Sequence, residues 1–146
     1  MASLKKYLKQ KGFVPVKMSR TSTDHFEVQA IVNGVPGRFI VDTGASNTCI
    51  AQEHADHFGL VSEEAEVKAA GAGASDMEAR ISQENSIKLG KWKRKKLQVV
   101  LFDLSHVNHA LTSQESGVID GIIGADILKK GRAVIDYKKK MLYLKS

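Results

Sequence analysis

Val-Asp-Thr-Gly-Ala-Ser, the residues from Val41 to Ser46, interrupts a run of apolar residues in this 146-residue chain. Gly37 to Val41 before it and Thr48 to Ile50 after it have strand-like composition, so Asp42 is predicted to lie at the tip of a strand–turn–strand unit. Gly44 permits the tight turn that this geometry requires. A carboxylate between two apolar strands is costly unless it is hydrogen-bonded or has a function. The triplet alone also fits an ordinary β-turn.

A second apolar stretch, from Val118 to Leu128, is predicted to form a strand, a glycine turn and a short helix. Gly124 opens the predicted helix and Gly131 closes it, with Asp126 in the first turn and Lys129-Lys130 in the last. This order of charges is the one that a helix dipole favours, and glycine suits the position after a helix. The segment by itself indicates a buried strand followed by a helix.

Further elements are predicted from apolar runs that are bounded by turn residues. Phe26 to Val32 and Val35 to Val41 flank Asn33-Gly34, which is a strong hairpin signal. The other predicted elements are a terminal hairpin of Ala133 to Tyr137 and Met141 to Leu144, a strand from Leu97 to Phe102, and a helix-like segment from Gln52 to Leu60.

The apolar-Asp-Thr-Gly-Ala loop at Asp42 and the apolar-apolar-Gly motif at Ile122-Ile123-Gly124 together resemble the retropepsin-like aspartic proteases. This superfamily contains the retroviral proteases and their single-domain cellular and bacterial relatives. The order of the motifs and the length between them also fit, and the resemblance covers roughly Phe26 to Leu144. It implies a mainly β, closed, barrel-like domain with one or two short helices that is active as a homodimer.

The resemblance implies hydrolysis of peptide bonds by two Asp42 carboxylates, one from each subunit, because a chain with one Asp-Thr-Gly supplies half of the pair. Carboxylates that lie so close share one proton, so one activates a water molecule while the other protonates the substrate carbonyl. The mechanism needs no metal and no cofactor. The expected substrate is an extended peptide or protein segment that binds by β-strand addition.

Other roles in the site also follow from the resemblance. Thr43 is expected to bond across the dimer, Gly44 to leave room for substrate, and Ala45 to stand where pepsin-like enzymes carry a hydroxyl residue. A hydroxyl that donates to a carboxylate favours its charged form, so Ala45 predicts activity nearer neutral pH than that of pepsin. The residues expected to support the aspartate loop from behind are Ile122, Ile123 and Gly124.

A stretch of small residues lies where the family has its flap, a hairpin that folds over bound peptide. Gly71, Ala72 and Gly73 are expected to form its tip, because glycine suits a segment that must bend and bring backbone donors to substrate. The alternative is a plain flexible loop, since no diagnostic side chain fixes the alignment here.

Composition limits the class of protein. At 146 residues the chain has room for one domain, and the predicted division is a basic leader at 1–20 and a protease domain at 21–146. The net charge is +6, and a hydrophobic content of 42% argues against disorder. One cysteine excludes an intrachain disulfide, and neither a transmembrane run nor a signal peptide is expected, so a cytoplasmic location is predicted.

Several further features have a structural and a functional interpretation. The spacing of His54 and His57, repeated at His106 and His109, could present metal ligands, but solvated polar faces are favoured because no zinc signature accompanies them. For Cys49, buried packing is favoured over a redox-controlled thiol.

Two basic segments also have a structural and a functional interpretation, and the structural one is favoured for each. Lys91 to Lys96 includes Trp92 and could contact phosphates or anionic lipid, but a solvated turn or edge strand is favoured and no nucleic-acid partner is expected. In the leader, Leu4, Tyr7 and Leu8 fall on one face of a short potential helix. Packing on the body of the domain is favoured over membrane attachment or a removable inhibitory segment.

Two functions remain. A homodimeric aspartic endopeptidase is favoured by the intact Asp-Thr-Gly, because a pure binding protein has no chemical use for a desolvated pair of carboxylates. The alternative is a non-catalytic or weakly catalytic retropepsin-like dimer that holds peptides in its groove and has a basic face for an acidic partner. In either case, Met141 to Leu144 and part of the leader are expected at the dimer interface.

Overall fold

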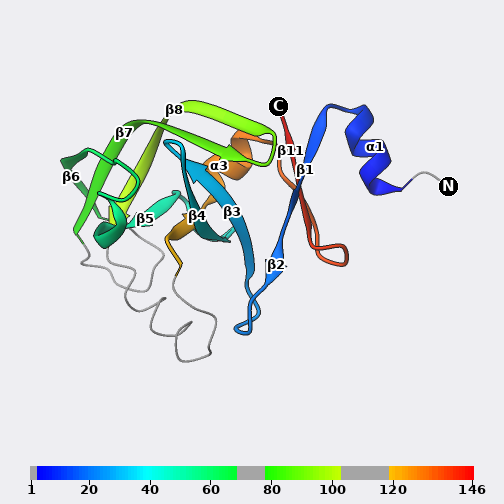
Figure 1. Cartoon of the computed structure of the whole chain (residues 1–146), viewed down its shortest axis with the longest axis horizontal. Helices are drawn as coiled ribbons and strands as arrows, with labels where there is room; N and C mark the ends of the chain where they lie inside the picture. Colours follow the sequence, from blue (N-terminus) through cyan, green and yellow to red (C-terminus); the bar gives the residue numbers. More distant parts are fainter. Residues whose placement is uncertain (1–2, 69–77, 103–118) are drawn as a thin grey trace.

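The computed structural model describes residues 3–68, 78–102 and 119–146 (Figure 1). Strands dominate this part of the chain, which also has two short α-helices, α1 (Leu4–Gln10) and α3 (Ala125–Lys130), and one 3-10 turn, η1 (Gln52–His54). The strands are β1 (Phe13–Lys17), β2 (Ser19–Arg20), β3 (Phe26–Val32), β4 (Val35–Val41), β5 (Cys49–Ala51), β6 (Ser62–Lys68), β7 (Glu78–Leu89), β8 (Trp92–Phe102), β9 (Gly121–Ile123), β10 (Val134–Asp136) and β11 (Met141–Lys145).

Six of the described strands close into a barrel in the order β3, β4, β9, β5, β8 and β7, and pairing between β7 and β3 completes it. β4 runs parallel to β9 and β5 runs parallel to β8, while the other neighbours in the barrel are antiparallel. β2 and β6 extend the sheet beyond the barrel. The mainly β, closed architecture with two short helices among the described residues confirms the predicted fold.

The barrel wall follows the two-residue period of strands. In β3, Val28, Ala30 and Val32 are buried, whereas Gln29 and Ile31 between them are exposed. This alternation gives β3 one face in the hydrophobic core, whereas every residue of β5 and of β9 is buried. The largest fully buried side chains include Phe39, Phe58, Trp92, Leu101 and Tyr143.

The predicted hairpin at Asn33-Gly34 is confirmed. β3 and β4 pair from Phe26–Val41 to Val32–Val35, and both turn residues have positive φ, 51° at Asn33 and 84° at Gly34. The Asn33 side chain also donates to the Phe58 carbonyl at 3.0 Å and to Asn85 Oδ1 at 2.9 Å. This turn residue therefore joins three separate segments of the barrel.

The basic run from Lys91 to Lys96 agrees with the prediction of a solvated turn or an edge strand. Lys91 is an exposed residue of the turn between β7 and β8. The start of β8 pairs with β7 alone, because β5 pairs with β8 only from Val100 to Phe102, yet Trp92 is completely buried. The indole N–H of Trp92 donates to the Lys145 carbonyl at 3.1 Å, so this end of β8 is tied to the C-terminal strand. Lys91 and Lys93 are exposed on either side of the inward-facing tryptophan, as the pleat of a strand requires, whereas the neighbours Lys95 and Lys96 are both exposed and Lys96 has a φ of 56°.

The helix-like segment expected from Gln52 to Leu60 is helical only at its start. The structure has η1 there, followed by turns that end at Gly59, whose φ is 65°. This short path turns the chain sharply enough to bury Phe58 completely. The predicted helix at the second motif, by contrast, is present as α3, with Gly124 as its N-cap and Gly131 as its C-cap.

A second, three-stranded sheet is formed by the two ends of the chain in the order β1, β11, β10. β1 pairs with β11 from Phe13–Lys145 to Lys17–Met141, so part of the basic leader is a strand of the folded body (Figure 1). α1 precedes it and buries Leu8. Within the described ranges, no helix has both the length and the apolar character that crossing a membrane would require.

Candidate active site

Asp42 lies directly after β4, and Gly124 lies directly after β9, its parallel neighbour. Because parallel strands end at the same edge of a sheet, this topology brings the two sequence motifs together. The Asp42 backbone N–H donates to the Ile123 carbonyl at 3.0 Å, which continues the ladder past the end of β4. The two motifs are therefore one structural unit, although about eighty residues separate them in the chain.

The Asp42 carboxylate is held by its own loop. The Gly44 backbone N–H donates to Asp42 Oδ1 at 2.9 Å, and the Ala45 N–H donates to the Asp42 carbonyl at 3.2 Å. A backbone N–H donor stabilises an ionised carboxylate and fixes its orientation. Asp42, Thr43 and Gly44 are all exposed in the single chain, so this carboxylate faces solvent from the end of the barrel wall.

Gly124 packs against the back of the aspartate loop more closely than any side chain would permit. A Cβ at this position would lie 2.6 Å from the Asn47 carbonyl oxygen and 2.9 Å from that of Ala45. The next residue, Ala125, donates its N–H to the Ala45 carbonyl at 2.7 Å. The structure thus places the start of α3 in direct contact with the loop, and Ile122 and Ile123 are buried in β9 just before it.

Asp126 and Thr48 contribute to this unit, and the sequence did not single them out as a pair. Asp126 Oδ1 accepts from the Thr48 backbone N–H at 2.9 Å, from the Thr48 hydroxyl at 2.7 Å and from the Ile127 N–H at 2.8 Å. The Thr48 oxygen in turn accepts from the Gly124 N–H at 3.0 Å. The helix dipole predicted an acidic residue here, but its partner lies 78 positions away and leaves no local signal.

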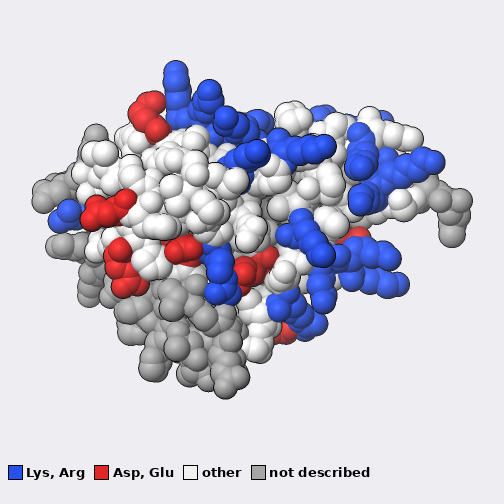
Figure 2. All heavy atoms as spheres, in the orientation of Figure 1, with Lys and Arg blue, Asp and Glu red and all other residues white. Residues whose placement is uncertain are grey.

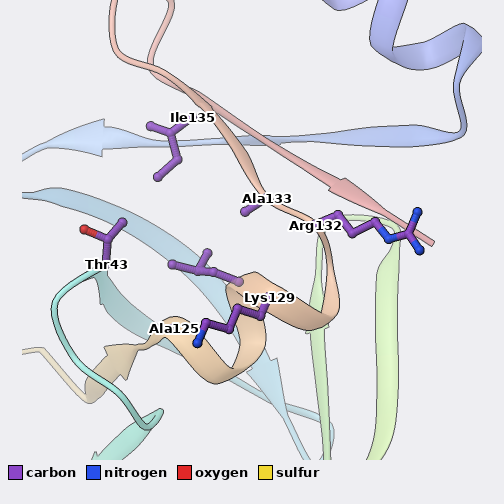
Figure 3. Close-up of a pocket in the computed structure, with 7 residues that line it drawn as sticks. Thr43, Ala125, Lys129, Arg132, Ala133 and Ile135 are labelled. Carbon is purple, nitrogen blue, oxygen red and sulfur yellow. The ribbon is translucent and has the colours of Figure 1, made fainter.

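An open hollow of about 440 Å³ lies beside the aspartate loop, between Thr43, α3 and β10 (Figure 3). Its lining is mainly apolar, and Figure 3 shows Ile135 above Thr43 at one side of the view, with Lys129 and Arg132 towards the other side. The lining residues are Thr43, Ala125, Leu128, Lys129, Arg132, Ala133 and Ile135.

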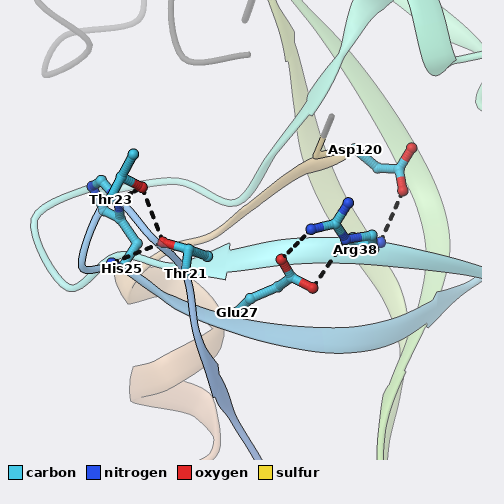
Figure 4. Close-up of polar contacts among 6 residues, drawn as sticks. All are labelled: Thr21, Thr23, His25, Glu27, Arg38 and Asp120. Atoms are coloured by element: carbon cyan, nitrogen blue, oxygen red, sulfur yellow. Dashed lines mark hydrogen bonds and ion pairs between the residues drawn. The ribbon is translucent and has the colours of Figure 1, made fainter. Parts of the chain in front are cut away.

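A polar network braces the chain just before β9 (Figure 4). Asp120 Oδ2 accepts from the Arg38 backbone N–H at 2.8 Å, and Asp120 Oδ1 lies 2.8 Å from His54 Nδ1. The Arg38 guanidinium forms a two-pronged pair with Glu27 at 3.0 and 2.6 Å, and these hydrogen bonds raise the pKa of Arg38. The network fixes β9 relative to β3 and β4, and so supports the Ile122-Ile123-Gly124 segment.

Cys49 follows the aspartate loop in β5 and is buried, in agreement with the packing interpretation. Burial raises the pKa of its thiol to about 12, and the nearby Asp126 and Asp42 charges act in the same direction. The thiol donates to the Asn47 carbonyl at 3.1 Å. A thiol with so high a pKa is protonated at neutral pH and is a poor nucleophile.

The remaining sequence-based candidates are only partly within the described residues. Gly71, Ala72 and Gly73, the expected flap tip, lie outside them, as do His106 and His109. The strands on either side of the flap segment, β6 and β7, pair antiparallel. Across the described ranges, no group of three or more His, Cys, Asp or Glu residues is arranged to hold a metal ion.

Three solved structures share this fold. A retropepsin-like aspartic protease from Rickettsia conorii is 24% identical and matches with a TM-score of 0.56, over 91% of this chain and 88% of that one. The retroviral protease-like domain of Ddi1 from Leishmania major is 20% identical, with a TM-score of 0.59 over 82% and 87%. EIAV protease, in complex with the inhibitor HBY-793, is 18% identical, with a TM-score of 0.54 over 73% and 86%.

Comparison of the sequence with protein-family profiles identifies the family of this chain. A search of curated proteins found no match. The sequence profile described as aspartyl protease matches residues 28–127, which is more than half of the chain and includes both motifs. The protein therefore belongs to the aspartyl protease family.

Proposed function

We propose that this protein is an aspartic endopeptidase that acts as a homodimer, with one Asp42 from each subunit in a shared active site. The observation that carries the proposal is that the Asp42 carboxylate is held in place but exposed in the single chain. Its carboxylate is oriented by the Gly44 N–H, braced from behind by the start of α3, and yet exposed. A rigidly built but uncovered carboxylate, in a chain of the aspartyl protease family, fits half of a two-aspartate site.

The chemistry of such a pair follows from electrostatics. Two carboxylates that share a site cannot both ionise easily, so the pair holds one proton. The ionised Asp42 takes a proton from a bound water, which attacks the scissile carbonyl, while the protonated Asp42 donates to the carbonyl oxygen. The roles then reverse as the tetrahedral intermediate collapses. Activity nearer neutral pH than that of pepsin, argued from Ala45, remains a prediction of this proposal.

The second subunit is proposed to dock at the free edge of β10 rather than at the C-terminal strand. β11 is the central strand of its sheet: β1 pairs with it from Met141 to Lys145 on one side, and β10 pairs with it from Met141 to Tyr143 on the other. β10 has an open edge among the described strands. An unpaired edge of this kind is a template for pairing with another chain.

Apolar side chains next to β10 support this assignment. Ile135 lines the hollow that Thr43 also lines, so a copy that fills the hollow approaches the aspartate loop. Tyr137, just after β10, is 71% exposed and packs on Phe26 with 5.2 Å between ring centroids. An exposed aromatic beside an apolar hollow is a common anchor in protein interfaces.

The proposed substrate is an extended peptide. It would lie across the two Asp42 residues as an added strand, below the hairpin that β6 and β7 begin. The sequence places the flap tip at Gly71 to Gly73, and this assignment rests on its position between those two strands.

Cleavage of a denatured protein and of a peptide library tests the proposal. The wild-type protein is expected to cut both, and Asp42→Asn is expected to lose cleavage while it keeps the fold, since the amide oxygen of the substituted side chain can accept the same Gly44 hydrogen bond. Asp56→Asn, at an exposed carboxylate outside the site, is the control and should cleave like the wild type. Cleavage that survives Asp42→Asn would remove the mechanism. Peptide binding without any cleavage by the wild type would favour the binding-module alternative.

A further inference from the structure

Charge is divided unevenly along this chain. Residues 1–20 and 124–146 carry thirteen Lys and Arg side chains against two acidic ones, which gives a net charge of +11. Residues 21–123 carry nine basic and fourteen acidic side chains, which gives −5. The sum hides this division, because the whole chain is only moderately basic at +6.

The two basic segments meet in space and form what we call the basic end, residues 1–20 and 124–146. β1 pairs with β11 along its full length, and α1 leads into β1. The Met18 N–H donates to the Lys140 carbonyl at 2.9 Å, which ties the leader to the turn between β10 and β11. On the face shown in Figure 2, Lys and Arg gather towards the end where Figure 1 places α1 and this turn.

α1 also exposes apolar surface at this end. Leu8 is the buried residue of the helix, whereas Leu4 is 44% exposed and Tyr7 is 52% exposed. Residues three apart lie side by side on a helix, so Leu4 and Tyr7 form one apolar strip. Lys5, Lys6 and Lys9 of the same helix are exposed around it. The Lys11 ammonium lies over the Tyr7 ring, 5.7 Å from its centroid, so a cation adjoins the strip.

We propose that the basic end docks on the surface of an anionic lipid bilayer. Leu4 and Tyr7 enter the interface, and the lysines of α1 and of the Lys138 to Lys140 turn contact the headgroups. An apolar strip flanked by lysine is the pattern of helices that lie in the membrane interface, where tyrosine rings are also enriched. Each lysine near an anionic surface strengthens binding about fivefold at moderate salt.

The composition of the basic end favours a bilayer over a nucleic acid. Eleven of its thirteen basic residues are lysine, and one of the two arginines, Arg20, is paired with Asp24. Base edges are read mainly by arginine and amide side chains, and bidentate phosphate contacts also need arginine. Exposed leucine gains nothing from a phosphate backbone, but it gains free energy when it enters the interface of a bilayer.

The side chains proposed to dock differ from those of the proposed active site, although the basic end as defined also contains Gly124 and Asp126 behind the aspartate loop. The docking side chains belong to α1 and to the β10–β11 turn, whereas Asp42 lies between β4 and β5, in the barrel wall. The inference therefore does not depend on the proposed protease activity, and either can fail alone.

Co-sedimentation of the full chain with vesicles tests the inference. We expect binding to vesicles in which about a third of the lipid is anionic phosphatidylglycerol, little binding to neutral phosphatidylcholine, and release at high salt, where screening is strong. The double variant Leu4→Ser with Tyr7→Ser should bind roughly tenfold more weakly. Replacing Lys5, Lys6 and Lys9 by Gln should weaken binding on the order of a hundredfold.

Matched controls come from the acidic part of the chain. Val61→Ser removes an apolar side chain that is 76% exposed, and Arg80→Gln removes an exposed charge. Neither should change vesicle binding. Urea unfolding of the α1 variants should match the wild type, because Leu8, which anchors the helix, is unchanged, and their peptide cleavage should also be unchanged.

Three results would overturn the inference. The first is equal binding to neutral and anionic vesicles, or binding to neither at low salt. The second is an α1 variant that binds anionic vesicles as the wild type does. The third is a duplex oligonucleotide that binds in the same buffer, displaces the vesicles and is indifferent to the Leu4 and Tyr7 substitutions, which would assign the basic end to nucleic acid.

Discussion

Asp126 is the residue on which the geometry of the aspartate loop most depends, apart from Asp42 itself. It accepts three hydrogen bonds, two of them from Thr48, and Thr48 accepts the Gly124 N–H. Asp126→Ala leaves these donors unpaired in a half-buried place, so we expect the free energy of unfolding to fall by about 1–3 kcal/mol. Urea unfolding measures this change, and the same variant should lose cleavage because Thr48 no longer positions the start of α3.

The exposed Asp56 gives the control for Asp126, since Asp56→Ala removes a carboxylate without burying a donor. A double-mutant cycle of Asp126→Ala with Thr48→Val isolates the interaction between the two side chains. If the two substitutions destabilise the fold additively, Thr48 and Asp126 do not act as one unit.

Cys49 predicts a particular dependence of stability on pH. Its pKa is raised from 9.0 to about 12 in the fold, so the unfolded chain releases the thiol proton at lower pH than the folded chain does. The contribution of Cys49 to stability is therefore complete below about pH 9 and is lost as the pH rises towards 12. Cys49→Ala should show a shallower decline of unfolding free energy across this range. Parallel curves for the two proteins would show that the thiol is not perturbed.

At the scale of elements, the contact between the aspartate loop and the start of α3 depends on Gly124. Its φ of −99° suits any residue, so the requirement for glycine is steric, because a Cβ would lie 2.6 Å from the Asn47 carbonyl oxygen. Gly124→Ala should push the aspartate loop away from the start of α3 and lower the free energy of unfolding by about 1–3 kcal/mol. Gly44→Ala is the matched control, since its Cβ would meet only the exposed Asp42 carboxylate at 3.3 Å. Equal unfolding midpoints for the two variants would contradict this steric argument.

Elements were predictable where the signal is local. The Asn33-Gly34 hairpin and α3 were both found because turn conformation, capping and charge order are written in adjacent residues. The segment from Gln52 to Leu60 was misread because its polar, helix-compatible composition gives no sign that Phe58 must reach the core. The burial of Trp92 was missed for a similar reason, because the lysines around it suggested a solvated segment, although alternation along a strand places Trp92 inward.

At the scale of the whole molecule, the two short motifs predicted the architecture through their resemblance to the retropepsin-like aspartic proteases. The parallel pairing of β4 with β9, which brings the two motifs together, was not predicted. The partnership of Asp126 with Thr48, the network around Asp120 and the hollow beside Thr43 depend on long-range register, which no window of sequence contains. The central position of β11, between β1 and β10, is likewise the reason that the dimer contact is proposed at β10, because terminal strands can pair within one chain as well as between two.

A site made from two copies of Asp42 has a consequence that a complete site within one chain would not have. When wild-type and Asp42→Asn subunits are mixed in equal amounts and exchange freely, about one dimer in four contains two aspartates, so cleavage should fall to roughly a quarter. Independent monomers would retain about half, because each wild-type chain would act alone. Cleavage measured against the fraction of variant, at constant total protein, separates a quadratic decline from a linear one. Mixing with Asp56→Asn should leave cleavage unchanged, and dilution of the wild type should lower the activity per subunit as dimers dissociate.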